Sequence, residues 1–378
     1  MSFLVNTLAS VYTAAFDLIQ PCLPSPSLVI NGRSYEIVRS LGEGAFASVL
    51  LVRDTATSRE FALKKMIVPS GMTLAANAAQ NEVTWTRRLN GNKNIIELKD
   101  CAIETSTKSI TTTIGSDGNS GGDKVYLMLL PVYRGGSLMN MIYRNMVENT
   151  HMPESRVLEL FSGICEGVLA MHTYTAKTPE ETAQATRMHQ VIAENCPEYA
   201  QSHPATDENG QLLFPCAHRD IKPGNVLLSD DGVPVLMDLG SADVARQWVG
   251  DRSQALTLQD DAAQLCSMPY RAPELFDVKP EAVIDEAVDI WSLGCLLYAL
   301  AFNDSPFERQ QNQQGGNIAL AVLGAKYTVP SSARQHYSQE LIDLIKFILN
   351  PDPAARPNIR QVLAQVQQLR SASTAARE

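Results

Sequence analysis

One stretch limits more than any other what this chain can fold into. Residues 217–243 have the sequence AHRDIKPGNVLLSDDGVPVLMDLGSAD, in which charged and amide side chains surround two short apolar runs. The pair Asp231–Gly232 lies between these runs and is typical of the turn of a tight β-hairpin. Such a hairpin brings Asn225 and Asp238 back to one end, where both side chains can contact the same metal ion.

The polar side chains of this stretch suit the transfer of a phosphoryl group. Asp220 can accept a proton from an attacking hydroxyl, and Lys222 can neutralise charge on the group that is transferred. Asn225 and Asp238 offer oxygen ligands of the kind that Mg²⁺ prefers. Because phosphoryl transfer depends mostly on positioning and charge stabilisation, buried strands that hold these groups still would fit this chemistry.

Length and composition are those of a soluble globular protein with room for two lobes. The chain has 378 residues, of which 45% are hydrophobic and 19% are charged. The net charge of −10 argues against a nucleic-acid-binding surface, so we expect no nucleic-acid partner. The cysteines are scattered and include no CxxC pair, which fits a reducing compartment and offers no zinc site.

The hydrophobic pattern predicts a small β-rich half followed by a larger helical half. From about Glu154 the chain is helical, and SRVLELFSGICEGVLAMH is strongly periodic. We therefore expect an α+β fold with two lobes and no internal repeat. In the first half we expect strands over 34–40, 47–54, 60–66, 95–103 and 124–132, and a helix over 73–89.

Two segments are expected to interrupt this fold. Residues 105–123 are rich in Ser, Thr and Gly and indicate a mobile loop. Residues 173–213 are polar and contain several prolines, which predicts an insertion of weak structure. The run PEETAQATRMHQVIAEN has some helical period, so a small helical hairpin is the alternative. We expect the insertion to be structural filler rather than a substrate or partner site.

A glycine-rich stretch lies between the first two expected strands. In LGEGAFASV, residues 41–49, Gly42 and Gly44 let the backbone come close to phosphate oxygens and offer N–H groups to them. Lys64 in the next strand carries an ammonium group that can meet the phosphates. Glu82, on the helix that follows, can pair with Lys64 and fix its position.

These motifs together resemble a eukaryotic protein kinase from about Ser34 to Arg370. The Gly-rich loop, the strand lysine, the helix glutamate, HRDIKPGN, DLG, APE, DIWSLG and a late arginine follow one another in the order of that family. The resemblance implies a bilobal protein kinase fold that uses ATP and Mg²⁺ and acts on protein substrates. The expected divisions are an apolar N-terminal segment (1–31), an N-lobe (32–132), a C-lobe (133–370) and a tail (371–378).

The resemblance also implies a role for each motif residue. By family analogy, Asp289 of DIWSLG braces the catalytic loop, and Arg356 pairs with Glu274 of APE. The implied catalytic residues are Asp220, Lys222, Lys64 and Glu82, and the implied metal ligands are Asn225 and Asp238. The implied nucleotide-binding residues are Leu41, Gly42, Glu43, Gly44, Ala45, Phe46, Ala47, Ser48, Val49, Ala62, Lys64, Leu130, Pro131, Tyr133 and Leu227.

Two positions depart from the family pattern. Ala47 replaces the third glycine of the phosphate loop, which is the most replaceable of the three, so we expect only a modest effect on nucleotide binding. Leu239 replaces the usual phenylalanine of the metal motif and can fill the same apolar space, while the metal ligand Asp238 is kept.

The activation segment resembles the Numb-associated kinase family, within it the myristoylated and palmitoylated serine/threonine kinase branch. The segment RSQALTLQDDAAQLCSMPYRAPELFDV and the hinge LMLLPVYRGGSL carry this resemblance. It implies that Leu130 is the gatekeeper and that the Pro131 carbonyl and Tyr133 N–H face the adenine, between Ala62 and Leu227. It also implies Ser/Thr specificity, a helical activation segment, activity without an upstream kinase, and acyl anchoring to endomembranes.

The N-terminal segment leaves two interpretations open. Leu4, Leu8, Val11, Ala15 and Ile19 fall on one helical face, and no Lys or Arg precedes the Pro/Ser linker. Such a helix could pack on the domain or stay disordered. Alternatively it could lie on a membrane surface.

For the membrane interpretation, Cys22 is the candidate acylation site, because residue 2 is Ser and myristoylation needs Gly there. We expect peripheral attachment to the cytosolic face of an endomembrane, of the Golgi or the vacuole.

The residues around Asp220 and in the activation segment also indicate how the chain is regulated. Arg219 precedes Asp220 and can bind a phosphate on the activation segment, where we expect autophosphorylation at Ser253 or Thr257. Ser267 is expected instead to contact Asp220 and Lys222.

A membrane-associated pseudokinase or scaffold is the alternative function. Such a protein would lack part of the catalytic set, whereas this chain keeps all of it.

Overall fold

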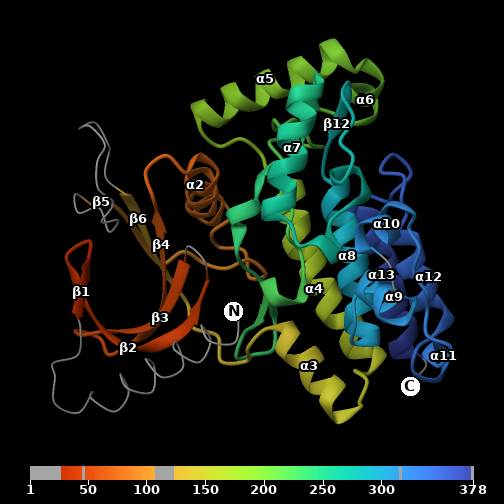
Figure 1. The fold of residues 1–378 in the computed structure, drawn as a ribbon, viewed down its shortest axis with the longest axis horizontal. Helices are drawn as coiled ribbons and strands as arrows, with labels where there is room; N and C mark the ends of the chain where they lie inside the picture. Colours follow the sequence, from red (N-terminus) through yellow and green to blue (C-terminus); the bar gives the residue numbers. More distant parts are fainter. Residues whose placement is uncertain (1–26, 45–46, 107–122, 315–316, 376–378) are drawn as a thin grey trace. The chain divides into compact units, whose positions relative to one another are not determined.

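The computed structural model describes residues 27–44, 47–106, 123–314 and 317–375 (Figure 1). The chain divides into two compact units. The first contains the described residues up to Met72 together with Leu98–Val132 and is built around a sheet. The second contains Thr73–Glu97 and Tyr133–Glu378 and is mainly helical. The predicted α+β fold is therefore confirmed, although residues 73–97, expected in the N-lobe, group with the second unit.

The first unit is a six-stranded antiparallel sheet with the strand order β1-β2-β3-β4-β6-β5. The expected strands rich in β-branched and aliphatic residues are present. The strands are β1 (Ser27–Ile30), β2 (Arg33–Glu43), β3 (Ala47–Asp54), β4 (Glu60–Val68), β5 (Asp100–Ser106) and β6 (Asp123–Leu130).

Strand β1 was not predicted, and it lies before residue 32, where the kinase domain was expected to begin. Asn31 and Gly32 join β1 to β2 with φ angles of 48° and 80°. An Asn-Gly pair favours these left-handed angles and the tight hairpin that they form. This dipeptide was the signal for the missing strand, and it places Ser27–Ile30 in the sheet rather than in the N-terminal segment.

The strand expected over 95–103 begins five residues late, so the prediction for 95–99 is wrong. Ile95 and Ile96 are buried in the second unit, where the Ile96 N–H donates to the Leu236 carbonyl at 2.8 Å. The apolar pattern was real, but the Ile95 side chain fills a core cluster of the second unit rather than the sheet.

The described part of the second unit is a helical domain with three two-stranded β-sheets. Its helices are α2 (Thr73–Arg88), α3 (Leu138–Glu148), α4 (Glu154–His172), α5 (Pro179–Asn195), α6 (Pro197–Ser202), α7 (Arg252–Leu265), α8 (Ala287–Phe302), α9 (Pro306–Gln314), α10 (Ile318–Leu323), α11 (Ala333–His336), α12 (Gln339–Ile348) and α13 (Ile359–Ala375). Its short strands are β7 (Cys216–Ala217), β8 (Val226–Leu228), β9 (Pro234–Leu236), β10 (Asp243–Val244), β11 (Gln247–Val249) and β12 (Ala282–Ile284), and its 3₁₀ turns are η2 (Pro223–Asn225), η3 (Leu239–Ser241), η4 (Met268–Tyr270) and η5 (Pro273–Leu275).

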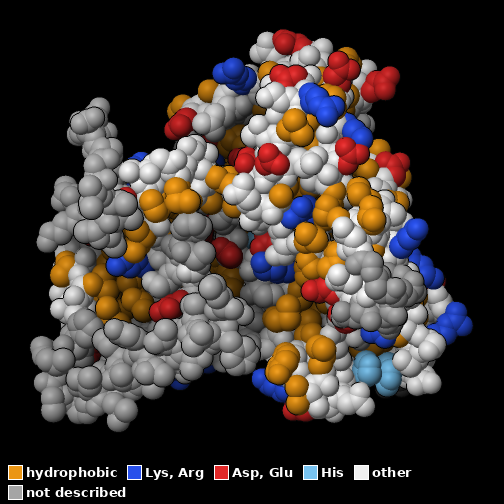
Figure 2. All heavy atoms as spheres, in the orientation of Figure 1, with side chains coloured by type: hydrophobic (Ala, Val, Ile, Leu, Met, Phe, Trp, Pro, Cys, Tyr) orange, Lys and Arg blue, Asp and Glu red, His pale blue; other side chains and the backbone are white. Residues whose placement is uncertain are grey.

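Helix α8 is the centre of this core. Every residue from Val288 to Phe302 is buried, as expected of a helix that is apolar on all sides. Helices α4 and α12 pack against it. By contrast α3 keeps an apolar stripe at the surface, where hydrophobic side chains gather (Figure 2); it comprises Met139, Tyr143, Met146 and Val147. No helix in the described residues is both long and apolar enough to cross a bilayer.

The insertion at 173–213 is helical over much of its length, so the prediction of weak structure is wrong and the helical alternative is closer. Helix α5 begins after Thr178, whose hydroxyl accepts the Glu181 N–H at 3.2 Å, and has Pro179 at its first position. Helix α5 ends at Asn195, and the short helix α6 begins at Pro197 (Figure 1). The mobile loop expected at 105–123 falls mostly on residues 107–122, outside the described residues.

The predicted pair between Arg356 and Glu274 is confirmed. The two guanidinium Nη atoms donate to the two carboxylate oxygens at 2.7 and 3.1 Å. Arg356 also donates to the Ala287 carbonyl at the start of α8 and lies over the Trp291 ring. Its side chain is fully buried, so the arginine joins three segments of the core without access to water.

We predict that Arg356→Ala lowers the free energy of unfolding by about 3 kcal/mol, because it leaves the Glu274 carboxylate and a helix-start carbonyl without their donor. Lys346→Ala is the matched control, since the Lys346–Asp343 ion pair is exposed and should add nothing measurable. Urea unfolding of both variants followed by circular dichroism measures the difference. Equal midpoints for the two variants would contradict the structural role of Arg356.

Candidate active site

The carboxylate of Asp220 is held from three sides. Its Oδ2 atom accepts hydrogen bonds from Lys222 Nζ at 2.7 Å and from Asn225 Nδ2 at 2.9 Å. Its Oδ1 atom accepts the backbone N–H of Ser267 at 2.8 Å, and the Ser267 hydroxyl accepts a second hydrogen bond from Lys222 Nζ at 2.7 Å. The structure therefore brings Asp220, Lys222 and Asn225 together, and Ser267 contacts Asp220 and Lys222 as predicted.

The loop that carries Asp220 is fastened to α8 through Asp289. The backbone N–H groups of His218 and Arg219 donate to its two carboxylate oxygens at 2.7 and 2.8 Å, as the family resemblance implied. His172 Nε2 lies 3.0 Å from the same carboxylate. Burial alone would raise the pKa of Asp289, but the hydrogen bonds from His172 and the His218 backbone hold it below its ordinary value.

His172 was not predicted as part of this site. It is the last residue of α4 and is buried at the end of a periodic apolar helix. A histidine at a buried position of an apolar helix must find a polar partner, and that is the signal in the sequence. The sequence gives no indication that the partner lies 117 positions away.

The backbone around Asp220 is fixed by its neighbours as well. His218 Nε2 lies 3.1 Å from the Met237 carbonyl, so this nitrogen carries the proton, and Nδ1 then accepts the Asp220 N–H at 3.3 Å. Arg219 has a left-handed φ of 65°, which is unfavourable for a residue with a side chain. The hydrogen bond from its N–H to Asp289 compensates for this strain.

The expected hairpin between Asn225 and Asp238 is present. Strands β8 and β9 pair in the register Val226 with Leu236, and the Met237 N–H donates to the Asn225 carbonyl at 2.9 Å. The two candidate metal ligands therefore sit at the same end of the hairpin. Because Asn225 Nδ2 already donates to the Asp220 carbonyl and carboxylate, the amide group turns its oxygen Oδ1 away from these partners. A carboxylate and an amide oxygen at one hairpin end fit Mg²⁺.

Glu82 of α2 lies beside the metal motif. Glu82 is buried, and its Oε2 atom lies 3.7 Å from the position that a Cβ on Gly240 would take. Asp238 Oδ1 lies at the same distance from that position. A Cβ at residue 240 would thus be in ordinary van der Waals contact with both carboxylates, which places Glu82 and Asp238 on either side of the DLG glycine.

A family model described as "Protein kinase domain" matches residues 35–176 and 214–366. The chain belongs to the protein kinase family. It is 34% identical to human serine/threonine-protein kinase 16 over 343 residues, which covers 91% of this chain and 92% of the relative. It is 31% identical to serine/threonine-protein kinase ENV7 of Saccharomyces cerevisiae over 358 residues, which covers 90% of this chain and 93% of the relative. It is 32% identical to serine/threonine-protein kinase ppk13 of Schizosaccharomyces pombe over 363 residues, which covers 94% of this chain and 98% of the relative. Together these matches show a serine/threonine protein kinase.

In the first unit, the described residues of the expected phosphate loop lie on or next to strands β2 and β3, and Lys64 lies on β4. Gly42 pairs with Val49, Glu43 pairs with Ser48, and the Gly44 N–H donates to the Ala47 carbonyl at 2.7 Å. Ala45 and Phe46, which were also predicted to bind nucleotide, lie outside the described residues. Leu41 is exposed on β2.

The register of the sheet decides which of its residues share a face. Lys64 is opposite Val49 on β3, and Ala62 is opposite Leu130 on β6. Directly opposed residues, and residues two apart on a strand, lie on the same face. Four predicted nucleotide-binding residues therefore share one face of the sheet: Val49, Ala62, Lys64 and Leu130.

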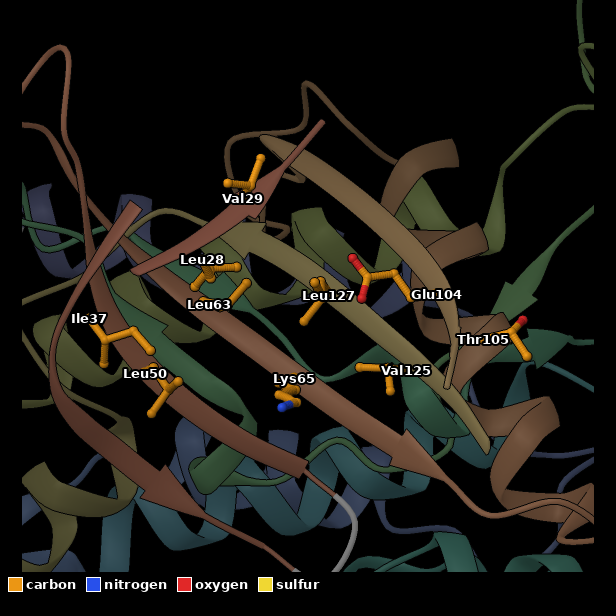
Figure 3. A pocket seen from close by; sticks show the side chains of 10 residues that line it. All are labelled: Leu28, Val29, Ile37, Leu50, Leu63, Lys65, Glu104, Thr105, Val125 and Leu127. Atoms are coloured by element: carbon orange, nitrogen blue, oxygen red, sulfur yellow. The ribbon is translucent and has the colours of Figure 1, made fainter. Parts of the chain in front are cut away.

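The reverse face of this sheet carries a groove of about 410 Å³. Leu50, Leu63 and Leu127 line it, and the Lys65 side chain points into it (Figure 3). Because Lys65 follows Lys64 in the strand, the groove lies on the face opposite to Lys64. This groove is therefore not the predicted nucleotide site.

The remaining predicted nucleotide residues follow the sheet or lie in the second unit. Pro131 and Tyr133 follow the end of β6 and are half-buried. Burial and the charges of Glu97 and Asp230 raise the pKa of the Tyr133 hydroxyl. Leu227 is in β8, opposite Val235 and in a bridge with Ser137.

The activation segment of the kinase is helical, as the resemblance implied. Helix α7 begins at the N-cap Asp251, whose side chain accepts the Gln254 N–H at 2.8 Å. It ends near Leu265, where the carbonyl accepts the Ser241 hydroxyl at 2.9 Å. The segment after the metal motif is thereby tied back to that motif.

We predict that Ser267→Ala lowers kcat about tenfold, because Lys222 Nζ loses one charge-assisted hydrogen bond while the backbone N–H to Asp220 is kept. Ser267→Thr is the control, since threonine retains the hydroxyl. Steady-state kinetics with a serine-containing peptide compare the two variants. A kcat for Ser267→Ala within twofold of that for Ser267→Thr would show that the hydroxyl is not needed.

A second prediction concerns acid stability. The pKa of Asp289 is lower in the folded chain than its ordinary value of 3.8, so the ionised group stabilises the folded state above that pH. This contribution should disappear as the pH falls through the folded pKa. We therefore expect the stability gap between wild type and Asp289→Asn to be wide at pH 7 and to narrow below about pH 4. Denaturant midpoints measured from pH 7 to pH 3 test it, and a constant gap would refute the assignment.

Proposed function

We propose that this serine/threonine protein kinase transfers the γ-phosphate of ATP directly to a protein hydroxyl, with Asp220 as the catalytic carboxylate. The observation that carries this proposal is the set of three donors around Asp220. Lys222 Nζ, Asn225 Nδ2 and the Ser267 N–H fix the carboxylate oxygens, so its position does not depend on the substrate. Such preorganisation is the main contribution a protein makes to phosphoryl transfer.

In the proposed mechanism Asp220 orients the substrate hydroxyl and takes its proton late in the transfer. Lys222, which also contacts Asp220, stabilises the charge of the transferred group. Lys64, whose pairing with Glu82 is implied by the family resemblance, would bind the α- and β-phosphates of ATP. Asn225 and Asp238 would hold Mg²⁺, which neutralises phosphate charge when it is bound. The presence of Lys222 and Ser267 around Asp220 supports serine or threonine, rather than tyrosine, as the acceptor.

We further propose membership of the Numb-associated family and autophosphorylation on α7. The helical activation segment and the similarity to serine/threonine-protein kinase 16 support membership of the Numb-associated family. Autophosphorylation is supported by the groove that Ser253 and Thr257 line together with Arg187, whose exposed guanidinium group is a candidate receptor for a phosphate. Arg219, the receptor expected from the sequence, instead donates to the Val244 carbonyl at 3.1 Å.

Asp238→Asn should reduce peptide phosphorylation by orders of magnitude with the fold intact, because the main candidate metal ligand loses its charge. The same variant should lose phosphate at Ser253 and Thr257 if the kinase modifies itself. Kinetics, circular dichroism and mass spectrometry of both proteins provide the comparison. Wild-type turnover in the variant would overturn the metal assignment, and bare Ser253 and Thr257 in active protein would overturn autophosphorylation there.

We also propose that the kinase acts at the cytosolic face of an endomembrane, the Golgi or the vacuole. Residues 4–22 lie outside the described residues, but the spacing of the apolar residues from Leu4 to Ile19 and the nearby Cys22 support attachment by a helix together with one acyl chain. A single acyl chain binds a membrane only marginally, so both elements are required.

Cys22→Ser should therefore shift the full-length protein from the membrane pellet to the cytosol. Fractionation of cells that carry wild type or variant measures this shift, and Cys101→Ser is a control for the loss of a thiol. Equal distribution of wild type and Cys22→Ser would remove acylation at Cys22 from the proposal.

A further inference from the structure

The C-terminal end of α2 is anchored by a buried ion pair. Arg88, the last residue of α2, donates from Nε to Glu181 Oε1 at 2.7 Å, and the two side chains are only 19% and 6% exposed. The guanidinium group also lies over the rings of Trp85 and Phe214, 4.6 and 5.4 Å from their centroids. Because a buried charge is tolerated only when it is paired, this contact fixes both side chains in one geometry.

Glu181 is equally well held on its own side. It lies in the first turn of α5, and its Oε2 atom accepts the Lys177 N–H at 2.8 Å and the Tyr174 hydroxyl at 3.2 Å. Burial would raise the pKa of Glu181, but the Lys177 N–H and Arg88 lower it below its ordinary value. The carboxylate is therefore ionised and preoriented toward Arg88.

The base of the insertion packs on the same part of α2. Tyr174 lies at the start of the insertion and Phe214 directly follows its end, and the Phe214 N–H donates to the Tyr174 carbonyl at 2.8 Å. Both rings contact Trp85, with centroids at 5.8 and 5.9 Å. The start, the first helix and the end of the insertion thus all meet α2.

This anchor is close to the catalytic side chain of the helix. Glu82 precedes Arg88 by six residues, which is about 9 Å along an α-helix. The Glu82 carboxylate lies beside Gly240 of the metal motif, so a small rotation of α2 would change its distance to that motif. The anchored end of α2 is therefore near enough to influence where the Glu82 carboxylate lies.

We propose that Glu181 is a positioning residue for phosphoryl transfer, acting through Arg88 to fix α2 and the Glu82 carboxylate. Glu181 belongs to residues 177–213, the internal segment that the protein kinase family model does not match. The insertion is then a brace for the catalytic helix and not the filler expected from its composition. A brace of this kind holds α2 in place without a phosphate on the activation segment.

The test compares Glu181→Gln, Arg88→Ala and the double variant in the full-length chain. Glu180→Gln is the matched control, because Glu180 is exposed in the same helical turn. The kcat and KM for ATP and for a serine peptide are measured at a temperature where circular dichroism shows every variant folded. We expect Glu181→Gln to lower kcat about tenfold with peptide KM within twofold, and Glu180→Gln to change neither.

The double variant separates a brace from two unrelated effects. If Glu181 acts through Arg88, the double variant has the kcat of Arg88→Ala alone, because both changes remove the same contact. Hydrogen exchange of the amides from Glu82 to Arg88 should also become faster in Glu181→Gln. A variant that melts earlier but keeps wild-type kcat and α2 protection, or losses that multiply in the double variant, would overturn the proposal.

Discussion

The catalytic loop depends on one buried carboxylate, that of Asp289. It receives two consecutive backbone N–H groups, and it lies in the first turn of the fully buried helix α8, where the helix dipole favours a negative charge. These hydrogen bonds stabilise the left-handed backbone of Arg219, and this conformation sets the direction of Asp220. The core helix therefore fixes the buried loop that carries Asp220 through a single ionised group, and Arg356 donates a hydrogen bond to the first residue of the same helix.

Two adjacent lysines illustrate how much the alternation of a strand decides. Lys64 and Lys65 have the same chemistry, but they lie on opposite faces of β4. Lys64 shares its face with Val49 and Ala62, whereas Lys65 points into an apolar groove on the reverse face. A shift of one residue in the register of β3 and β4 would exchange these two roles. The site therefore requires the regular register between β3 and β4, whereas the neighbouring pairing of β2 with β3 contains bulges.

Much of the fold and of the candidate site could be predicted, because motif residues close in sequence stay close in space. The hairpin that aligns Asn225 with Asp238 follows from a turn dipeptide and two apolar runs. The contacts of Asp289 and Arg356 could be predicted only from the family resemblance. Strand β1 was missed although its Asn31–Gly32 turn was visible, and Ile95 shows that an apolar pattern does not identify the core it fills. The pair between Arg88 and Glu181 could not be predicted, since both residues resemble ordinary surface charges of amphipathic helices.

The base of the insertion has a consequence for how this region can vary. Tyr174 and Phe214 are joined by a backbone hydrogen bond, so the chain leaves the domain and returns to it at nearly one point. Closing a loop whose ends already meet costs little more when the loop grows, about 0.6 kcal/mol for each doubling of its length. The exposed residues 208–211 can therefore lengthen or change sequence with little effect on the domain, whereas Tyr199 and Pro204 are hydrogen-bonded to Asp285 and Arg246 and have to stay in place. The position is a natural site for inserting a foreign sequence into this kinase.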